Sequence, residues 1–277
     1  MKTYIIHHND ADGFGAAWSA YLKFGENAEY FPINYGWVFP KLDNNSDVYI
    51  LDFSISREHL DELVSRMNSV LILDHHKSAL ENLNGHPNCF FDMNRSGAGI
   101  AWDYFHPNVP RPDFINYIED QDLWRFSLPD SEYVRNSLTM IPHTIKDYCE
   151  ASKMTLEDRI YEGKIIDKQI EYNLSRGIDY LHVMEIDEFR MLCVNVCLHQ
   201  SNYGNRLLEL IEKYNCHFAG VYYRVNQDFV RFSLRSKKDF DVSLVCKRFG
   251  GGEHFQAAGF DIALDRFNWK KISSKEV

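Results

Sequence analysis

The sequence predicts an α/β fold with two domains. The first is a parallel sheet covered by helices on both faces, and a long helix joins it to a smaller mixed-sheet α/β domain. Three observations lead to this prediction. Short apolar runs alternate with stretches of helical periodicity over the first part of the chain, which is typical of a parallel sheet. One long helical pattern follows from about residue 155. Beyond it, strand-like runs lie closer together and include a hairpin.

The N-terminal domain is expected to cover residues 1–150. Its strands are short apolar runs rich in β-branched and aromatic residues, and each is followed by a helical pattern. Right-handed crossovers between parallel strands are therefore expected. The predicted strands are 3–6, 48–51, 69–73 and 89–91, and the predicted helices are 15–24, one that opens at Ser56, 97–105 and 114–120.

A connector helix is expected over 151–179. Thr155 and Asp158 form a helix-start signature, and Gly177 is suited to a C-terminal cap. The C-terminal domain is then expected over 180–277. Its predicted strands are 189–196, 217–225 and 229–235, its predicted helices are 203–213 and 241–248, and its tail over 270–277 is expected to be disordered.

The composition narrows the classes of protein that the chain can belong to. The 277 residues are 45% hydrophobic and 25% charged, as in ordinary globular proteins. A formal net charge of −10 disfavours a protein that grips long duplex nucleic acid by neutralising phosphates. We expect neither a membrane span nor a signal peptide, because no apolar run is long enough. The six cysteines have no Cys-x-x-Cys spacing, so reduced thiols in a cytoplasmic protein are expected.

Acidic and imidazole side chains follow three of the predicted strands. Such groups are costly at the ends of buried strands unless a cation neutralises them. In open α/β sheets, ligands bind in the crevice outside the carboxyl ends of the strands. The residues are His7, His8, Asp10 and Asp12 after the first strand, Asp52 after the second, and Asp74, His75 and His76 after the third.

This set of residues predicts a site for two divalent metal ions. Asp10 and Asp12 are separated by one residue, and Asp52 can bridge two ions through its two oxygens. Carboxylate oxygens with a few imidazoles suit Mn²⁺ or Mg²⁺ better than a structural zinc site. Two ions about 3.5–4 Å apart would clamp the attacking and leaving oxygens of a displacement at phosphorus. Any one of these residues alone is more often a turn or cap residue, but three strand ends together make coincidence a poor explanation.

Four motifs carry a resemblance to a known family. They resemble the ordered motifs of the DHH phosphoesterase superfamily, and the glycine-rich motif resembles its C-terminal DHHA1 domain. The resemblance covers nearly the whole chain and is to the branch with RecJ-type exonucleases and small oligoribonucleases, not to the pyrophosphatase branch. The motifs are His8-Asn9-Asp10-Ala11-Asp12-Gly13, Leu51-Asp52-Phe53-Ser54, Asp74-His75-His76 and Gly250-Gly251-Gly252-Glu253-His254-Phe255-Gln256-Ala257-Ala258-Gly259.

The resemblance implies a site for two Mn²⁺ ions, with Mg²⁺ as the other candidate. His8, Asp10 and Asp52 would hold one ion, with His7 as the rival of His8. Asp12, Asp52 and His75 would hold the other, completed by a later aspartate. Asp120 matches the position of that aspartate best by spacing, and Asp122 is its competitor. His76 and Asp74 are expected in catalytic roles, with His76 facing the scissile phosphate and Asp74 supporting the metal site.

The C-terminal domain resembles a substrate clamp. Arg235, followed by Ser236, could bind a terminal phosphate through its two guanidinium nitrogens. Gly251 and Gly252 offer backbone N–H groups, and His254 adds a side-chain donor. Arg95 and Ser96 precede a helix and could add phosphate contacts, but an ordinary helix start capped by Ser96 explains them equally well.

The expected function is a Mn²⁺-dependent phosphodiesterase that releases 5′-mononucleotides from short single-stranded RNA or from a linear dinucleotide such as pGpG. Two other enzyme activities remain open: a phosphatase acting on 3′-phosphoadenosine 5′-phosphate and a cyclic-dinucleotide phosphodiesterase. A non-catalytic nucleotide-binding regulatory protein is the alternative from another class. The sequence does not determine the oligomeric state, and a homodimer is one possibility.

Overall fold

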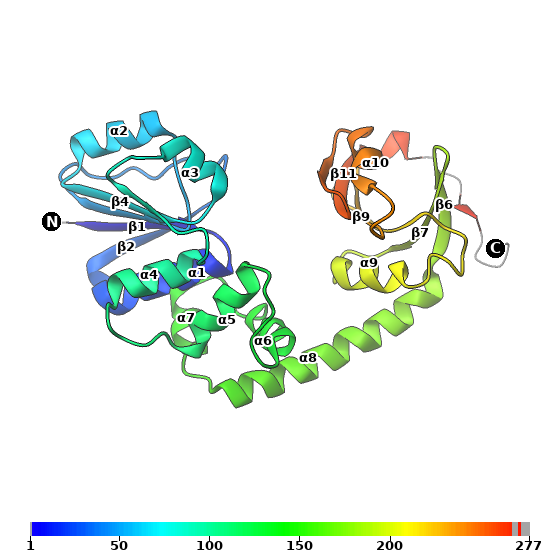
Figure 1. Ribbon diagram of the computed structural model, residues 1–277, viewed down its shortest axis with the longest axis horizontal. Helices are drawn as coiled ribbons and strands as arrows, with labels where there is room; N and C mark the ends of the chain where they lie inside the picture. The colour runs from blue at the N-terminus through cyan, green and yellow to red at the C-terminus, as the bar shows by residue number, and fades with distance from the viewer. Residues whose placement is uncertain (1, 268–270, 273–277) are drawn as a thin grey trace. The chain divides into compact units, whose positions relative to one another are not determined.

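The structure is a computed structural model, and it describes residues 2–267 and 271–272. The chain forms two compact units, one up to Asp167 and the other from Lys168 onward. The boundary falls within α8 (Leu156–Gly177), the helix drawn in green in Figure 1. The tail over 270–277, apart from the two residues of β12, lies outside the described residues.

The first unit is built on a five-stranded parallel sheet. Its strand order, β2-β1-β3-β4-β5, confirms the predicted α/β fold. The edge strand β2 was not predicted, because it carries Glu29 and Pro32 and exposes much of its length. The strands are β1 (Thr3–His8), β2 (Ala28–Ile33), β3 (Asp47–Leu51), β4 (Ser69–Asp74) and β5 (Cys89–Phe91).

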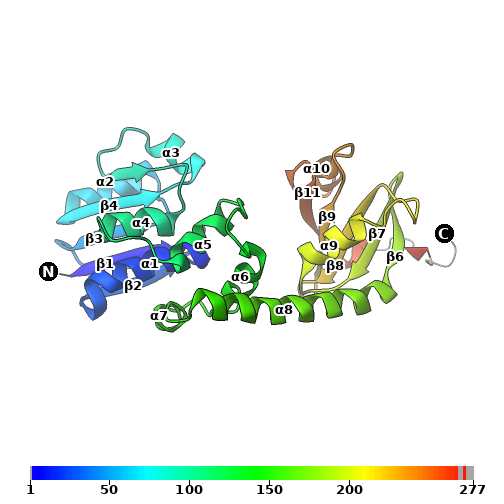
Figure 2. The same ribbon diagram turned by 60° about the horizontal axis from the view of Figure 1, so that its bottom comes forward.

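Helices cover both faces of this sheet, as predicted (Figures 1 and 2). Side chains alternate between the faces along each strand, so Ile5 of β1 packs in the core with α1 and α4 while Tyr4 and Ile6 pack in the core with α2 and α3. The helices are α1 (Ala11–Phe24), which leads into the short 3-10 helix Gly25–Asn27, α2 (Arg57–Arg66), α3 (Lys77–Leu83) and α4 (Gly97–Phe105).

Three further helices extend the first unit. They are α5 (Asp113–Asp122), which packs against α1 and α4, α6 (Ser131–Leu138), which packs against α5, and α7 (Ile145–Ala151), which packs against α1. Together they enclose a separate core that contains Trp18, Trp102 and Phe114. The sequence predicted α5 but not α6 or α7. This packing brings the end of α5 to the same edge of the sheet as the ends of β1, β3 and β4, because Asp122 there contacts His75.

The described residues of the second unit form a seven-stranded mixed sheet with α-helices α9 and α10 after the end of α8, as the predicted fold class requires. Its order is β10-β11-β9-β8-β7-β6-β12, and every neighbouring pair is antiparallel except β7 and β8. The elements are a 3-10 helix (Ile178–Tyr180), β6 (His182–Ile186), β7 (Phe189–Asn195), α9 (Gln200–Leu208), β8 (Phe218–Arg224), β9 (Phe229–Arg235), α10 (Val242–Lys247), β10 (Gly252–His254), β11 (Ala257–Ala263), a 3-10 helix (Leu264–Arg266) and β12 (Lys271–Ile272). Among the described helices, none is both long and apolar enough to cross a membrane.

Candidate metal centre

The strand order places a ligand site between β1 and β3. From β1 the chain connects to β2 on one side, whereas β3, β4 and β5 lie on the other side. The carboxyl ends of the two strands at such a reversal leave a crevice that binds ligands in doubly wound sheets. His8 ends β1 and Asp10 follows it, while Asp52 follows β3. The topology therefore brings these three side chains to one crevice.

The first ligand group consists of His8, Asp10 and Asp52. His8 Nδ1 lies 2.6 Å from Asp10 Oδ2 and 3.8 Å from Asp52 Oδ2. Asp10 is also the N-cap of α1, because its Oδ1 accepts a hydrogen bond from the backbone N–H of Gly13 at 2.9 Å. One carboxylate oxygen of Asp10 is thus fixed by the helix while the other faces His8.

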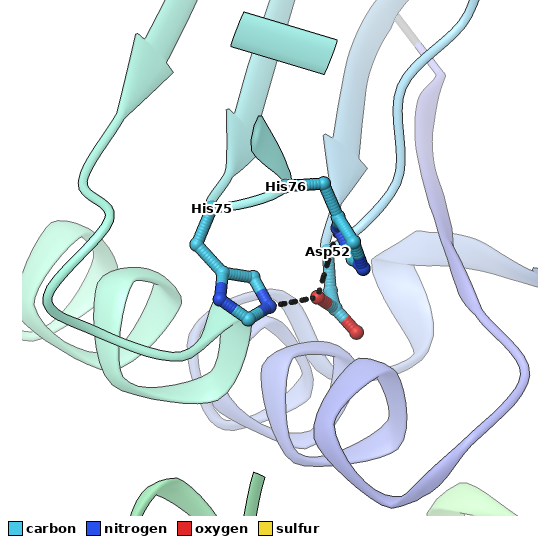
Figure 3. A group of neighbouring side chains, drawn as sticks. All are labelled: Asp52, His75 and His76. Atoms are coloured by element: carbon cyan, nitrogen blue, oxygen red, sulfur yellow. Dashed lines mark ion pairs between the residues drawn. The ribbon is translucent and has the colours of Figure 1, made fainter. Parts of the chain in front are cut away.

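The second ligand group is centred on His75, whose Nε2 faces three carboxylates. It lies 3.2 Å from Asp52 Oδ1, 3.5 Å from Asp122 Oδ2 and 3.7 Å from Asp12 Oδ2. Figure 3 shows His75 and His76 approaching the Asp52 carboxylate from the end of β4. Since Asp52 Oδ2 faces His8 and Oδ1 faces His75, the two groups share this carboxylate.

Asp12 is held by the start of α4. Its Oδ2 accepts a hydrogen bond from the backbone N–H of Gly97 at 2.6 Å, and its Oδ1 accepts one from Ala98 at 3.0 Å. The N-terminus of a helix stabilises negative charge, because its first N–H groups lack partners within the helix. The helix therefore fixes a carboxylate that is 2% exposed and keeps it at the site.

The carboxylates of the site lie close enough together that ionising all of them is unfavourable without a cation. Burial, followed by Asp12, Asp10 and Asp122, raises the pKa of Asp52 well above its usual value. Burial and the neighbouring Asp12 and Asp10 also raise the pKa of Asp122, to about 8. His8 Nδ1 and Asp52 Oδ1 are buried without a well-aligned hydrogen bond in the described part of the chain. Oxygen and imidazole donors in this arrangement fit two divalent ions.

Asp74 positions His76 and is not part of either ligand group. Its Oδ1 accepts a hydrogen bond from His76 Nδ1 at 2.7 Å, and its Oδ2 accepts one from the Ser54 hydroxyl at 2.5 Å. Although burial opposes ionisation, these hydrogen bonds lower the pKa of Asp74. The same hydrogen bond raises the pKa of His76. Within the described residues His76 Nε2 has no hydrogen-bond partner, so this atom can face a ligand.

Asp122, and not Asp120, is the aspartate that the structure places beside His75. Asp120 is 3% exposed, and its carboxylate accepts hydrogen bonds from Ser127, Leu128 and Ser131. Asp120 therefore folds the segment after α5 back on itself and is unavailable to a metal. Asp122, two residues later, is the aspartate that faces His75.

The two candidate histidines of β1 lie in different environments. His7 is fully buried, its Nδ1 contacts the carbonyl oxygen of His8 at 2.9 Å, and its ring packs edge-on against Phe14. Burial lowers the pKa of His7 to about 4. Since neighbouring residues on a strand point to opposite sides, His8 reaches the carboxylates and His7 does not.

Arg95 and Ser96 have structural roles, in agreement with the alternative explanation by a helix start. Ser96 is fully buried and caps α4, because its hydroxyl accepts a hydrogen bond from the N–H of Gly99 at 3.2 Å. Arg95 donates to the carbonyl oxygen of Gly99 at 2.6 Å and pairs with Asp103. The Ser96 hydroxyl and the Arg95 guanidinium thus both bind groups of α4, and substrate contacts by either residue remain a prediction.

The second unit places Arg235 and His254 on one face of its sheet. Ala257 of β11 pairs with Arg235 of β9 on one side and with His254 of β10 on the other. Residues in register across a sheet point to the same face, so the two basic side chains flank Ala257. Arg235 also donates to Ser201 and to the carbonyl oxygen of Leu234.

Ser236, which was predicted to contact substrate, is buried within the second unit. It is 1% exposed, and its hydroxyl donates to the carbonyl oxygen of Phe240 at 2.6 Å. Gly251 and Gly252 join α10 to β10. A Cβ on Gly251 would lie 2.1 Å from the carbonyl oxygen of Gly259, so the close approach of two backbones requires glycine at this position.

Comparisons with known proteins find relatives along nearly the whole chain. No protein-family model matches the sequence. R106, an uncharacterized protein of Acanthamoeba polyphaga mimivirus, is 28% identical over 92% of this chain and 66% of its own length. The oligoribonuclease NrnB of Bacillus subtilis is 27% identical over 94% of this chain and 72% of its own length. The solved structure of PggH, a pGpG-specific phosphodiesterase from Vibrio cholerae, matches 96% of this chain and 94% of its own with a TM-score of 0.55 and 13% identity.

These likenesses agree with the motifs and their places in the fold. Asp74, His75 and His76 end β4 beside the carboxylates of the other strand ends, and the fold is shared with PggH. The motifs and the fold of the chain therefore resemble those of the DHH superfamily. The chain spans about two thirds of R106 and about three quarters of NrnB.

The sequence analysis did not identify three groups that support the candidate metal centre. They are the N–H groups of Gly97 and Ala98, which hold Asp12, and the hydroxyl of Ser54, which holds Asp74. Ser54 lies within a motif that was recognised, but its role depends on a contact with the next strand. A helix start near residue 97 was predicted, and helix N-termini attract anions. That rule could have placed a carboxylate there.

Replacing Gly97 with alanine should disturb the candidate metal centre without unfolding the protein. The added Cβ would lie 2.3 Å from the Cβ of Asp52, so either Asp52 or the start of α4 must move. We expect Mn²⁺ affinity to fall by at least about tenfold, as when groups that orient metal ligands are lost. Calorimetric titration with Mn²⁺ and a thermal melt would measure both effects. Unchanged Mn²⁺ affinity in the Gly97→Ala protein would show that this close approach does not position Asp52.

Proposed function

We propose that this protein is a metal-dependent phosphodiesterase that hydrolyses very short RNA or linear dinucleotides to 5′-mononucleotides. The single observation that carries the proposal is the pair of ligand groups joined by Asp52. His8, Asp10 and Asp52 would hold one ion, and Asp12, Asp52, His75 and Asp122 would hold the other. When bound, two Mn²⁺ ions, or Mg²⁺ in their place, supply Lewis-acid chemistry that stabilises charge developing on a phosphate.

His76 is proposed to act on the scissile phosphate. Its ring is 36% exposed beside the ligand groups, and Asp74 fixes its orientation through Nδ1. Nε2 then points away from Asp74 and can donate a hydrogen bond to a phosphate oxygen. Because Asp74 is ionised and in contact with the ring, it stabilises the protonated form of His76, which is the better donor.

The second unit is proposed to bind a phosphate of the substrate through Arg235 and His254. Their places on either side of Ala257 put two basic side chains two strand spacings apart, roughly 10 Å between backbones. Long side chains on such a row can converge on one anion. The N–H of Gly251 donates to the carbonyl oxygen of Cys246 at 3.0 Å and Gly252 pairs with Gly259 of β11, so the proposal rests on the two side chains.

The names of the relatives support a short substrate. NrnB is an oligoribonuclease, and PggH acts on the dinucleotide pGpG. The net charge of −10 is also unfavourable for long polyanions, whose binding depends on many basic contacts. A substrate with one or two phosphodiester bonds needs few of these contacts.

A panel of substrates tests the proposal. Purified protein would be incubated with dinucleotides, RNAs of two to five and of more than twenty nucleotides, cyclic dinucleotides and 3′-phosphoadenosine 5′-phosphate. Each reaction would contain Mn²⁺, Mg²⁺ or a chelator, and the products would be separated by chromatography. We expect 5′-mononucleotides from dinucleotides and short RNA with metal, and no product with chelator.

Two outcomes would contradict this assignment. Release of inorganic phosphate from 3′-phosphoadenosine 5′-phosphate without dinucleotide cleavage would favour a phosphatase. Binding of nucleotides without turnover of any compound, under conditions in which Mn²⁺ binding is shown by calorimetry, would favour a regulatory nucleotide-binding protein.

A further inference from the structure

A cavity of about 350 Å³ opens beside the metal centre in the first unit. It lies between the segment after β2, the segment after β3 and helix α3. Its size is within the range of small-molecule sites in proteins. The aromatic residues Tyr35, Trp37, Phe39 and Phe53 line it. The proposed metal site does not use this space.

The residues that line the cavity adjoin those of the metal centre. Phe53 follows Asp52 directly in the chain, and its ring centroid is 6.1 Å from that of His8. The ring of Tyr35 is 6.2 Å from the ring of His8. Ser54 also lines the cavity, and its hydroxyl donates to Asp74. A group attached to a phosphate at the metal centre would therefore extend naturally into this cavity.

Two of the aromatic residues that line the cavity are largely exposed. Tyr35 is 59% exposed and Trp37 is 55% exposed, whereas Phe53 is buried. A tight turn holds them, because the N–H of Trp37 donates to the carbonyl oxygen of Asn34 at 3.1 Å. Gly36 adopts a φ of 86°, which glycine permits without strain. The Tyr35 ring lies 4.5 Å from that of Phe53 at an angle of 34°.

Apart from the aromatic rings, the polar side chains that line the cavity are serine hydroxyls, two amides and the imidazole of His59. The lining contains no aspartate, glutamate, lysine or arginine among the described residues, so the cavity suits an uncharged ligand and not a phosphate. Asn34 and Asn82 each contribute a side-chain amide. Within the described part of the chain, neither amide group makes a hydrogen bond. Each can therefore offer a donor and an acceptor to a ligand.

The geometry points to this cavity as a subsite for a nucleobase of the substrate, stacked against Tyr35 or Trp37 and contacted at its edge by Asn34 or Asn82. A nucleobase is flat, uncharged and bordered by donors and acceptors, which matches the rings and the amides. Bases stack on aromatic side chains with little dependence on sequence. The inference rests on the proposed function for the position of the phosphate.

Calorimetric titration tests the subsite without requiring turnover. The probes are guanosine 5′-monophosphate and adenosine 5′-monophosphate, with ribose 5-phosphate as the compound that lacks a base, all in Mn²⁺. Wild type would be compared with Tyr35→Ala and Trp37→Ala. The matched control is Tyr161→Ala, which truncates a tyrosine that is 68% exposed on α8. Thermal melts would confirm that each variant is folded.

We expect wild type to bind at least one mononucleotide more tightly than ribose 5-phosphate. Tyr35→Ala or Trp37→Ala should raise the Kd of that mononucleotide by roughly 5- to 100-fold, the loss expected for one stacked base. The Tyr161→Ala control should match wild type. Equal Kd values for wild type and both cavity variants, or no preference of wild type for mononucleotides, would overturn the subsite.

The test separates failure of the subsite from failure of the proposed function. If the cavity variants lose mononucleotide affinity but wild type cleaves no dinucleotide, the subsite stands and the phosphodiesterase assignment fails. If wild type cleaves dinucleotides but the cavity variants bind mononucleotides as wild type does, the activity stands and the subsite is wrong.

Discussion

The Asp52→Asn protein should lose Mn²⁺-dependent turnover by more than about 100-fold. Loss of a group that only orients a metal ligand typically costs 10- to 100-fold, and Asp52 is proposed to contact both ions directly. The variant should also lose the stabilisation that Mn²⁺ gives to wild type. Binding at about 100 times the Kd stabilises a folded protein by about 2.7 kcal/mol, so wild type should show a clear rise in Tm with Mn²⁺.

Without metal, the same variant should be at least as stable as wild type. Asp52 is 1% exposed and lies near Asp10, Asp12 and Asp122, so its charge is unfavourable when no cation is present. Thermal melts with chelator and with Mn²⁺ would measure both effects. The control is Asp228→Asn in the exposed turn between β8 and β9. An Asp52→Asn protein whose Tm still rises with Mn²⁺ as wild type does would refute the shared-ligand model.

The sequence predicted the strands and helices whose pattern of apolar residues matches their burial in the folded protein. The central strands β1, β3 and β4 are buried on both faces, so their apolar runs are continuous and easily recognised. The edge strand β2 pairs with β1 alone. Its polar residues face solvent, and no local pattern distinguishes it from a loop. α6 and α7 are short, and their positions depend on packing against α5 and α1, respectively.

The sequence could predict the site residues that follow strands. It could not predict those whose side-chain direction depends on contacts with distant parts of the chain. His8, Asp10, Asp12, Asp52 and His75 follow strands whose ends must meet at one edge of the sheet, so the sequence placed them together. The later aspartate was different, because spacing alone cannot show which side of α5 faces the site. Its direction depends on the segment after α5, in which Trp124 and Phe126 adopt left-handed backbone conformations with φ of 54° and 47°. Bulky residues rarely adopt this conformation, and nothing local predicts it.

Asp120→Asn and Asp122→Asn should therefore have opposite effects, although they make the same chemical change two residues apart. Asp120→Asn should destabilise the protein by about 1.5–3 kcal/mol, because it removes buried hydrogen bonds to a charged group. It should leave Mn²⁺ affinity largely intact. Asp122→Asn should weaken Mn²⁺ binding by at least about tenfold. It should leave metal-free stability unchanged or raised, because a carboxylate near Asp12 and Asp52 becomes neutral.

Denaturant unfolding in chelator, together with calorimetric titration of Mn²⁺, distinguishes the two roles. If Asp120 were the ligand, its variant would lose Mn²⁺ affinity while Asp122→Asn kept it, and the position of α5 would have to differ from the one described. The contacts argue against that result. All the hydrogen bonds to the Asp120 carboxylate come from the segment 127–131, whereas Asp122 Oδ2 lies 3.5 Å from the ring nitrogen of His75. A carboxylate occupied by four donors cannot turn toward a metal without releasing the segment that it holds.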